Sequence, residues 1–559
     1  MMPDFLTFIK KQERFFPAGV FVLMICLYLP QIFLRDPILR DVASRYAPMA
    51  DAFASGDFKY AFHPRVSSLH PLISGCFSYI TGCSGFIGTQ LSALFFLGLC
   101  VFPLFRLLKQ VFDRETAVWG TLLLPFVSQV TAVSVSGLRE SHKLFALLLI
   151  SSGLITVFKE REKYCGYLLA GAGGGLAFCI RIDLVLPALA LITAAGMMEF
   201  AALKSLKRSL AGVFIALVFF IFETAVNHSI CGQAVPGSHY LRVLQYFPPQ
   251  VLTFSGILIY VVLPCLAAFA VFSVTGGWLL RFPFGKKLPF LAVILLVVIL
   301  SGNILWQLCH YIGLTVPDRI KLFYHFSGKV LGGVNPPLFL LAAIGIFSLK
   351  VQKKWDEEQA FLLFLFFVWI LGIIFQIVMI ENHVYVSKRY LLPVSVLLSG
   401  WGVHGIVFCG RKLRDAAGKR GEYLLRILFA VLPVVCLYHA YSNVLEYKFK
   451  REKKEQIQTQ KTIADVIRHH YSGPAYFTPE FSFYDYRGNR CPKIAFVRTG
   501  KEAAAAYRSG GSIVSLMQDP DFVVAPAEKV FSEKEWLKAA ENLPFGKISL
   551  HVWKRKRSK

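Results

Sequence analysis

The chain is poor in acidic residues, and its cysteines show no functional spacing. Its 559 residues contain 34 Asp and Glu against 60 Lys and Arg. Most of the 12 cysteines fall inside apolar segments, and Cys76, Cys83, Cys231 and Cys491, which we expect to be exposed, lack the spacing of a zinc or redox motif. No nucleotide-phosphate loop is visible, and no internal repeat suggests the inverted halves of a transporter. These absences argue against a zinc-ribbon protein, a thiol oxidoreductase and a nucleotide-binding fold.

Long apolar segments are abundant instead. Hydrophobic residues make up 55% of the chain and the mean hydropathy is +0.55, whereas soluble domains are about 45–50% apolar. A helix needs about 20 apolar residues to cross a bilayer. The sequence therefore predicts an all-α polytopic membrane protein with about thirteen transmembrane helices, at 15–34, 86–105, 117–137, 144–158, 164–180, 184–203, 209–226, 251–280, 288–308, 336–349, 360–380, 391–409 and 424–442.

The basic residues are distributed as membrane topology requires. If the N-terminus is cytoplasmic, the inner loops hold 24 Lys and Arg residues, and the outer loops, which are longer in total, hold 14. The positive-inside rule therefore predicts a cytoplasmic N-terminus and, with an odd number of spans, an extracytoplasmic C-terminal tail. Topology then explains most of the net charge of +26, which argues against nucleic acid as a partner. We see no small-residue cleavage site after the first apolar segment and expect an uncleaved anchor.

The sequence divides into a transmembrane domain, residues 1–442, and a hydrophilic C-terminal domain, residues 443–559. In the tail, "KTIADVIRHHY" and "SEKEWLKAAENL" predict amphipathic helices, the second opened by a Ser532/Glu535 capping box. Strands are predicted at "PAYFTPEFSFYDY", "PKIAFVRTG", "DFVVAP" and "ISLHVW". This alternation predicts a small α/β domain that serves as a cap or an interaction module.

The first outer loop, residues 35–85, predicts two helices. Apolar residues recur at helical spacing over residues 42–54, and Gly56 is a natural stop. A second, partly apolar helix follows within residues 63–82; at about 12 residues it is too short to span and is expected to lie along the interface. Asp41, just outside the first span, is a candidate general base. It could instead pair with a neighbouring arginine or cap the helix.

Charged residues also stand at the outer ends of later apolar segments. "SGLRESHKLF" places Arg139 and Glu140 in the shortest outer turn, either as solvated residues or as part of a site. Arg181 interrupts a nearly continuous apolar stretch, where it could pair with a nearby aspartate or face an anionic headgroup. Lys388 and Arg389 lie at the outer mouth of a span, against the orientation bias, which favours phosphate binding over simple interface anchoring.

In their order along the chain, these motifs resemble those of the C-type-fold membrane glycosyltransferases, in particular the group that contains protein O-mannosyltransferases and the lipid A aminoarabinose transferases. Asp41 followed by "RYAPMADAFASGDF" and "HPRVSSLHPL" is similar to the family's first outer loop. "GLRES", "GGGLAFCIRID" and "KRYLLP" are similar to its acidic turn before the fourth span, its Gly-rich span ending in Arg and its late Arg-Tyr motif. The resemblance covers about residues 20–410. The chain departs from the pattern at Val42, where a second acidic residue is frequent, and at His63-Pro64-Arg65, in place of "HPP".

The resemblance implies an inverting glycosyltransferase that moves a sugar from a polyprenyl-phosphate donor to a hydroxyl or amine of a lipid, glycan or protein acceptor. It would act at the outer face of a bacterial inner membrane, with membrane lipids around it. Asp41 would be the catalytic base, and Lys388, Arg389, Arg139 and Arg181 would bind the donor phosphate. The resemblance assigns no cofactor and leaves a divalent metal ion open. The other residues expected to line the site are Asp36, Arg40, Arg45, Tyr46, His63, Glu140 and Tyr390.

A different class of function remains open at this point. The chain could be a non-catalytic transporter or flippase for a lipid or polysaccharide, or an assembly subunit. A transporter predicts ionisable groups along a path at mid-bilayer depth, whereas this sequence gathers them at the outer face.

Overall fold

The computed structural model describes residues 13–34, 46–62, 66–127, 133–181, 184–231, 336–352, 356–380, 388–413 and 415–418, the C-terminal segments 494–496, 522–527, 532–545 and 548–556, and a few single residues. Among these residues, five helices are long and apolar enough to cross a membrane: Phe16–Phe33, Gly85–Val111, Glu140–Lys159, Lys207–Ser229 and Arg389–Gly418. The chain is therefore an integral membrane protein, as the sequence predicted. The count of thirteen spans is not confirmed, since the candidate spans 251–280, 288–308 and 424–442 lie outside the described residues.

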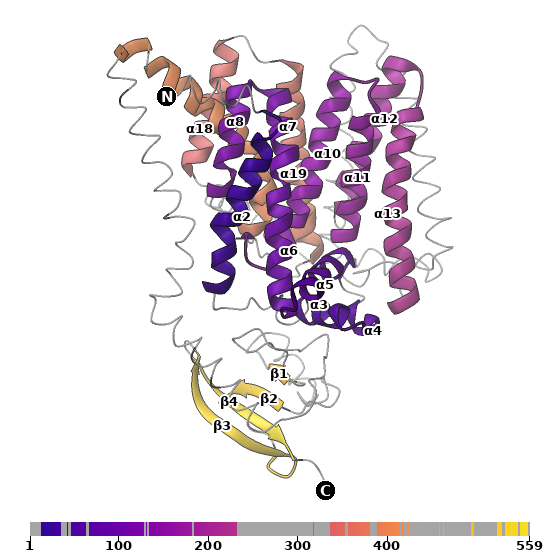
Figure 1. The fold of residues 1–559 in the computed structure, drawn as a ribbon, viewed down its shortest axis with the longest axis vertical. Helices are drawn as coiled ribbons and strands as arrows, with labels where there is room; N and C mark the ends of the chain where they lie inside the picture. Colours follow the sequence, from indigo (N-terminus) through magenta and orange to yellow (C-terminus); the bar gives the residue numbers. More distant parts are fainter. Residues whose placement is uncertain are drawn as a thin grey trace.

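The membrane part is a bundle of helices that stand side by side (Figure 1). Its central helix is α10 (Glu140–Lys159), which packs against helices before and after it in the chain. The other bundle helices are α2 (Phe16–Leu34), α6 (Gly85–Leu99), α7 (Val101–Val111), α8 (Arg114–Leu123), α11 (Tyr164–Ile180), α12 (Val185–Leu203), α13 (Lys207–Cys231), α18 (Pro336–Val351) and α19 (Glu357–Ile380). The apolar segment 117–137 is not one continuous helix, because α8 ends at Leu123 and the 3-10 turn η2 (Leu124–Phe126), which contains Pro125, follows it.

Small residues bring neighbouring helices close together. A Cβ on Gly153 of α10 would lie 2.6 Å from the backbone nitrogen of Ala170 on α11. A Cβ on Gly171 of α11 would lie 2.0 Å from the carbonyl oxygen of Gly212 on α13. Helices in a bilayer associate largely by such backbone approach, because lipid tails are as apolar as the helix surfaces. These contacts fix the lateral order α10, α11, α13.

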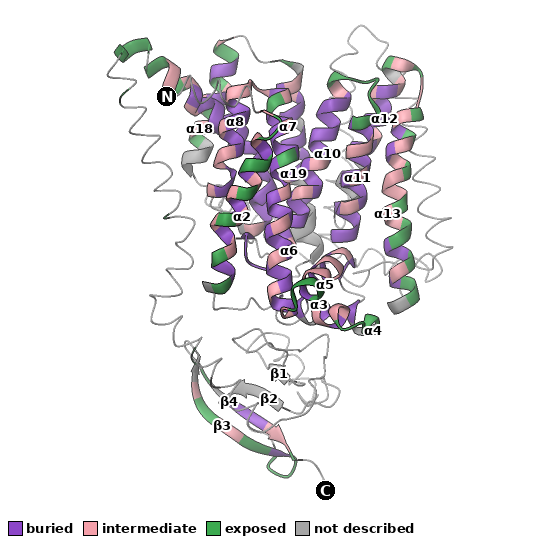
Figure 2. Cartoon of the chain, viewed as in Figure 1, coloured by how far each residue is buried: buried purple, intermediate pink, exposed green. Residues whose placement is uncertain are grey.

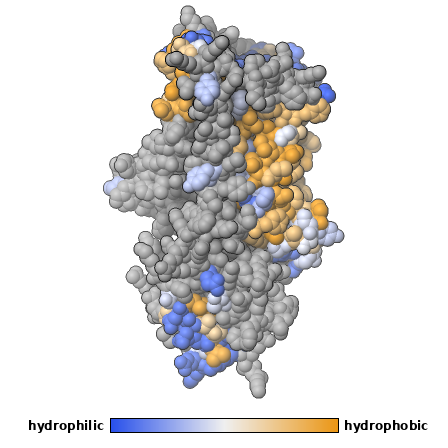
Figure 3. Space-filling view, turned by 60° about the vertical axis from the view of Figure 1, so that its left-hand side comes forward, coloured by the Kyte–Doolittle hydropathy of each residue, from blue (hydrophilic) through white to orange (hydrophobic). Residues whose placement is uncertain are grey.

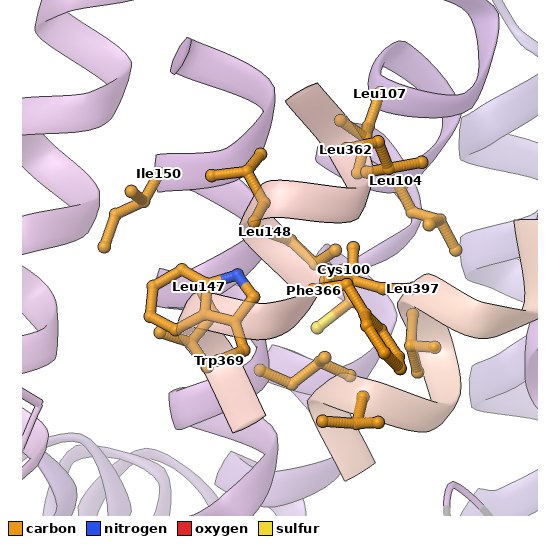
Figure 4. Close-up of a cluster of buried hydrophobic side chains, with 14 of the residues drawn as sticks. Cys100, Leu104, Leu107, Leu147, Leu148, Ile150, Leu362, Phe366, Trp369 and Leu397 are labelled. Atoms are coloured by element: carbon orange, nitrogen blue, oxygen red, sulfur yellow. The ribbon is translucent and has the colours of Figure 1, made fainter. Parts of the chain in front are cut away.

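The interior of the bundle is apolar. Leu147 and Leu148 of α10 pack with Phe366 and Trp369 of α19 and with Leu397 of the helical segment Arg389–Gly418 (Figure 4). Figure 2 shows buried residues along α10 and α6, whereas α13 is exposed along much of its length. On the face turned forward in Figure 3, hydrophobic residues cover the described side of the bundle between ends that carry hydrophilic residues. This distribution is the one expected for a bundle surrounded by lipid.

A layer of three short helices covers one end of the bundle: α3 (Ala47–Ala54), α4 (Phe58–Ala61) and α5 (Leu69–Thr81) (Figure 1). The two helices expected in the first outer loop are confirmed, with α3 ending just before Gly56, whose φ is 78°. The Oδ1 atom of Asp51 on α3 accepts a hydrogen bond from the backbone nitrogen of Gly85, at 2.6 Å, and so satisfies the start of α6. This layer is packed on the bundle and is not a solvated loop.

The opposite end of the bundle is held by ion pairs between chain segments. Glu13 contacts Lys109 at 2.5 Å and Arg114 at 3.2 Å. Arg411 pairs with Asp113 at 3.2 Å and also with Glu115. The short inner loops of the predicted topology therefore meet at the end far from α3, α4 and α5 (Figure 1).

The described part of the C-terminal tail is a four-stranded sheet in the order β1-β2-β4-β3, on the same end of the bundle as the helical layer (Figure 1). The strands are β1 (Ile494–Phe496), β2 (Phe522–Pro526), β3 (Trp536–Phe545) and β4 (Ile548–Arg555). β1 and β2 are parallel, and β4 pairs antiparallel with both β2 and β3, with Val524 opposite Val552 in the β2–β4 register. The strands predicted at "PKIAFVRTG", "DFVVAP" and "ISLHVW" are confirmed. The domain boundary at 442/443 lies outside the described residues and stays a prediction.

The helix predicted at "SEKEWLKAAENL" is wrong. Residues 536–545 form β3, which pairs with β4 through two irregularities of register. Trp536 is buried at 2% exposure, while Glu535 and Ser532 form only a turn before the strand. Pairing along β4 therefore overrides the helical propensity of this segment.

Candidate functional site at the start of helix α10

The turn before α10 brings several outer segments together. Gly137 has a φ of 70°, and a Cβ on it would lie 2.6 Å from Thr89 Oγ1 and 3.2 Å from Val42 Cγ1. A residue with a side chain would be strained at this φ and would collide with Thr89, so glycine allows the chain to turn sharply here. Arg139 then occupies the N-cap position of α10 without a side-chain capping bond, and Glu140 is the first helical residue.

Glu140 and Arg389 form an ion pair between the start of α10 and the 3-10 turn η8 (Lys388–Leu391). Arg389 Nε lies 3.4 Å from Glu140 Oε1, with side-chain exposures of 27% and 6%. The guanidinium of Arg389 also lies 5.3 Å from the centroid of the buried Tyr390 ring. Glu140 Oε2 is buried and has no hydrogen-bond partner among the described residues. The carboxylate thus neutralises one arginine and keeps an uncommitted acceptor.

Arg139 extends to the other side of the turn. Its Nη1 donates a hydrogen bond to the carbonyl oxygen of Ile180, the last residue of α11, at 3.2 Å. Its guanidinium lies 5.6 Å from the centroid of the Tyr46 ring, next to α3. Arg181, buried at 6% exposure, directly follows Ile180 and caps α11. The backbone contact of Arg139 therefore brings Arg181 next to the start of α10.

A row of four contacting rings joins the helical layer to α10. The centroids of Tyr46 and His70 are 4.7 Å apart, those of His70 and His142 are 4.9 Å apart, and those of His142 and Phe96 are 4.1 Å apart. Ser92 Oγ lies 2.8 Å from His142 Nε2. His70 Nε2 and His142 Nδ1 are buried without hydrogen-bond partners among the described residues. Both histidines are therefore polar groups placed inside the packing between α5, α6 and α10.

His70 lies outside the membrane-spanning helices, and its protonation is set by its surroundings. Burial, followed by the positive charge of Arg139, lowers the pKa of His70 to about 3, although the Gly137 carbonyl acts in the opposite direction. His70 is therefore neutral at physiological pH. A neutral ring packs against Tyr46 without placing a second positive charge beside Arg139.

The structure brings together part of the predicted site. Arg139, Glu140, Arg389 and Tyr390, together with the ring of Tyr46, gather around the start of α10, with Arg181 one residue from an Arg139 contact. Lys388 belongs to η8, but its side chain is not among those described. The predictions at Asp36, Arg40, Asp41, Arg45 and His63 lie outside the described residues. The roles assigned to all of these residues stay predictions.

The chain next to Asp41 reaches this turn. Val42 is fully buried and belongs to one apolar cluster with Tyr46 and Leu138. An ideal Cβ on Gly137 would lie 3.2 Å from Val42 Cγ1. The residue that follows Asp41 is therefore in contact with the loop that carries Arg139 and Glu140.

Sequence reasoning left one feature of this site open and missed another. Glu140, His142 and Lys143 are buried at 5% exposure or less, so the solvated-turn alternative is wrong for them. His70, to which the sequence analysis assigns no role, is completely buried between Tyr46 and His142. The available signal was the density of ionisable residues in a very short turn between two spans, since burying each one is costly.

Among the described residues, no group of three or more His, Cys, Asp or Glu side chains is arranged to hold a metal ion. Glu140 Oε2 is the acidic oxygen that the start of α10 leaves without a hydrogen bond. Asp36 and Asp41, the acidic residues of the first outer loop nearest the first span, lie outside the described residues. The metal ion therefore stays open, and no step below depends on it.

Comparison with known proteins places the fold. The chain matches no protein-family model and no curated protein sequence. Among solved structures, it is similar to the oligosaccharyltransferase of Archaeoglobus fulgidus in complex with zinc and sulfate, with a TM-score of 0.50 and 12% identity over 92% of this chain and 68% of that one. At this identity the likeness establishes the fold and not the reaction. The chain has the C-type glycosyltransferase fold that the resemblance implied.

Two further structures match with TM-scores below 0.50. ArnT from Cupriavidus metallidurans, bound to undecaprenyl phosphate, matches with a TM-score of 0.49 and 13% identity over 96% of this chain and 97% of that one. The oligosaccharyltransferase AglB from Archaeoglobus fulgidus, in complex with an inhibitory peptide and a dolichol-phosphate, matches with a TM-score of 0.47 and 13% identity over 92% and 70%.

Proposed function

We propose that the chain is an inverting membrane glycosyltransferase that moves a sugar from a polyprenyl-phosphate donor to a hydroxyl or amine acceptor. The observation that carries the proposal is the convergence of Arg139 and Arg389 on the two sides of Glu140 at the start of α10. Guanidinium groups bind phosphate oxygens in a planar, two-point geometry. The free backbone N–H groups at a helix start add to the attraction for an anion.

The donor phosphate would lie beside Arg389, which is the more accessible member of its ion pair. Arg139 and Arg181 would contribute positive charge from the side of α11, and Lys388 from η8. As the bond between the anomeric carbon and the phosphate oxygen breaks, its electron pair passes to the departing lipid phosphate. Preorganised positive groups stabilise that charge as it develops. The lipid phosphate is itself the activated leaving group, so the reaction needs no nucleotide fold.

The acceptor would be activated by Asp41. Its carboxylate would take the proton from the acceptor hydroxyl or amine while the acceptor atom bonds to the anomeric carbon, on the face opposite the phosphate. Displacement from the opposite face inverts the sugar. General-base assistance of this kind contributes about 10²–10⁴ in rate. The contact between Val42 and the turn at Gly137 supports a position of Asp41 near the phosphate-binding arginines.

We place this chemistry on the extracytoplasmic side of a bacterial inner membrane, with the N-terminus in the cytoplasm. The helical layer over the start of α10 and the C-terminal sheet lie at one end of the bundle, and the ion pairs of Glu13 and Arg411 lie at the other (Figure 1). The basic inner loops of the sequence meet at that second end, as the positive-inside rule requires of a cytoplasmic face. The sheet is then positioned to contact a lipid, glycan or protein acceptor.

The apolar packing inside the bundle favours an enzyme over a transporter. Between α10 and α19, Leu147, Leu148, Phe366 and Trp369 fill the interior at the depth where a transport path would need polar groups (Figure 4). The polar contact Trp369 Nε1 to Ser151 Oγ, 3.1 Å, is internal to this packing. A transporter would instead require this region to open to both sides.

The direct test compares Asp41→Asn with Asp57→Asn in membranes supplied with a radiolabelled polyprenyl-phosphate sugar. Asp57 lies in the same loop, is exposed and makes no side-chain cap, so the same chemical change there is a matched control. We expect Asp41→Asn to lower transfer by about 10²–10⁴ and Asp57→Asn to leave it unchanged. Retained transfer in Asp41→Asn would remove Asp41 as the base, and absence of transfer by the wild-type chain with any polyprenyl-phosphate sugar would overturn the proposed function.

A further inference from the structure

A carboxyl group that the proposed reaction does not use is buried in α13. Glu223 has no exposed surface, although it lies in a helix long and apolar enough to cross the membrane. Placing an ionisable residue in such a helix is costly, even on lenient scales about 2.5–3.5 kcal/mol. Its retention therefore calls for a specific partner.

That partner is the start of α5, far away in the sequence. Glu223 Oε1 accepts a hydrogen bond from the backbone nitrogen of Ser68 at 2.8 Å, and Oε2 accepts one from the Ser68 hydroxyl. Asn227, one turn later on α13, donates from Nδ2 to Glu223 Oε1 at 2.9 Å. Ser68 is the N-cap residue of α5, and its side chain makes no capping bond to that helix. The Glu223 carboxylate, which comes from another helix, therefore acts as the cap of α5.

The first turn of α5 carries a residue of the candidate site. His70, two residues after Ser68, is packed between Tyr46 and His142, with tilted rings at centroid distances of 4.7 Å and 4.9 Å. Tyr46 in turn lies under the Arg139 guanidinium. A displacement of Ser68 would therefore move a ring that contacts both α3 and α10.

We propose that Glu223 is a positioning residue that fixes the first turn of α5 so that His70 and Tyr46 stay packed against the start of α10. Its effect on sugar transfer rests on the proposed function, whereas its grip on α5 does not. Glu223 acts through Ser68 and His70 and does not itself touch substrate.

The chain provides a matched control at the other end of the bundle. Glu199 of α12 also has no exposed surface and also holds a helix start, accepting hydrogen bonds from the backbone nitrogens of Arg208 at 3.0 Å and Ser209 at 2.7 Å. The helix start that Glu199 holds is that of α13, at the end far from Glu223, and Glu199 also lies 3.6 Å from Arg208 Nη1. Glu199→Ala therefore removes a buried cap on the same helix without a direct contact to α5. A general loss of stability would affect both variants alike.

The first measurement follows α5 directly in the full-length protein. Cys76 on α5 and Cys165 on α11 are free cysteines, the first half-buried and the second exposed. In the detergent-solubilised protein, where both faces are accessible, we expect Glu223→Ala to raise the rate at which a polar maleimide labels Cys76 at least fivefold, read by peptide mass spectrometry, with the Cys165 rate unchanged. Glu223→Gln, which can still accept from the Ser68 nitrogen, should restore most of the protection. An unchanged Cys76 rate in Glu223→Ala, or an equal rise in Glu199→Ala, would overturn the proposal.

The second measurement follows transfer from a polyprenyl-phosphate sugar. We expect Glu223→Ala to raise the KM for the donor about tenfold, by loosening the contact of Tyr46 with Arg139, with a smaller effect on kcat and recovery in Glu223→Gln. Transfer kinetics equal to the wild type in a variant whose α5 is loosened would reduce Glu223 to a purely structural residue and refute the positioning role. If the wild-type chain transfers no sugar, the proposed function fails, and the labelling alone decides whether Glu223 holds α5.

Discussion

Replacing Arg389 by methionine is expected to leave the Glu140 carboxylate buried without its counter-charge. The pair spans 3.4 Å from Arg389 Nε to Glu140 Oε1. Two unit charges at this distance attract by about 5 kcal/mol at an effective dielectric constant near 20, before the cost of desolvation. Buried pairs lose about 3–5 kcal/mol when one partner is removed, and exposed pairs lose about 0–1. Because Arg389 is 27% exposed and Glu140 only 6%, we expect Arg389→Met to cost about 2–3 kcal/mol.

The opposite replacement should cost less. Glu140→Gln removes the carboxylate charge beside Arg389, on the more exposed side of the pair where water can solvate the guanidinium, so we expect a loss of about 1 kcal/mol. The double variant Arg389→Met with Glu140→Gln removes both charges and should be about as stable as Glu140→Gln alone. The two substitutions are therefore expected to be non-additive by about 2–3 kcal/mol.

Stability and transfer should respond differently in this cycle. The free energy of unfolding is measured by SDS titration in mixed micelles, with tryptophan fluorescence as the probe. Transfer is measured as the initial rate from a polyprenyl-phosphate sugar. The double variant is expected to regain stability and to remain about 10²–10³ slower than the wild type, because the positive group that stabilises the leaving phosphate is missing.

Two results would refute this reasoning. If the two single variants and the double variant have additive stabilities, the charges are not coupled as their distance implies. If the double variant recovers wild-type transfer, Arg389 serves only to neutralise Glu140 and does not bind the donor phosphate.

Three further predictions test the surroundings of this site with the same unfolding assay. Gly137→Ala should cost about 2–3 kcal/mol, because φ is 70° and the new methyl would lie 2.6 Å from Thr89 Oγ1. Gly82→Ala, with a φ of 66° and no atom within 4 Å of the new methyl, should cost about 1 kcal/mol, and equal losses in the two variants would contradict the proposed clash. The pKa of His70 falls from 6.5 to about 3 on folding. The free energy of unfolding should therefore decrease as the pH falls below 6.5, by up to about 1.4 kcal/mol per pH unit. His70→Gln should flatten this pH dependence, and an unchanged slope would show that His70 is not the group responsible. Tyr46→Leu removes the ring under the Arg139 guanidinium, 5.6 Å away, and should lower the free energy of unfolding by about 0.5–2 kcal/mol. In an Arg139→Met background the same substitution should cause no loss. A loss that persists in that background would be due to packing of the Tyr46 ring.

Local signals in the sequence predicted the first outer loop well. The helical spacing over residues 42–54 and the stop at Gly56 correspond to α3, which ends at Ala54, and the short second helix corresponds to α5. Each of these helices is determined by its own periodicity and by a glycine or loop at its end. Such features need no knowledge of the rest of the fold.

The contacts between distant segments could not be read from the sequence. Hydropathy placed Arg139, Glu140 and Arg389 at the same face of the membrane, but the lateral order of the helices decides which of them meet. That order depends on close contacts such as Gly153 against Ala170, which no local pattern specifies. The pairing of Glu140 with Arg389 therefore emerged only from the packed bundle.

Sequence reasoning gave one wrong element and omitted one buried residue, for different reasons. Residues 536–545 have a helical composition, yet they form a strand that pairs with β4, the next strand in the sequence. Glu223 lies within an apolar segment, and its partner Ser68, 155 residues earlier in the sequence, is the N-cap residue of α5. The partner of β3 is the next strand in the sequence, with Phe545 opposite Ile548, and pairing outweighs helical propensity there, whereas the partner of Glu223 is remote in sequence.

The unequal exposure of the bundle helices has a consequence for how the surrounding bilayer acts on the protein. In their apolar windows, α10 is 83% buried within the protein and α13 only 22%. Hydrophobic mismatch tilts helices that touch lipid, so a thinner or thicker bilayer acts on α13 first and leaves α10 shielded by its neighbours. Glu223 of α13 is hydrogen-bonded to Ser68 at the start of α5. A tilt of α13 caused by a change in membrane thickness would therefore displace α5 relative to α10, which stays in place.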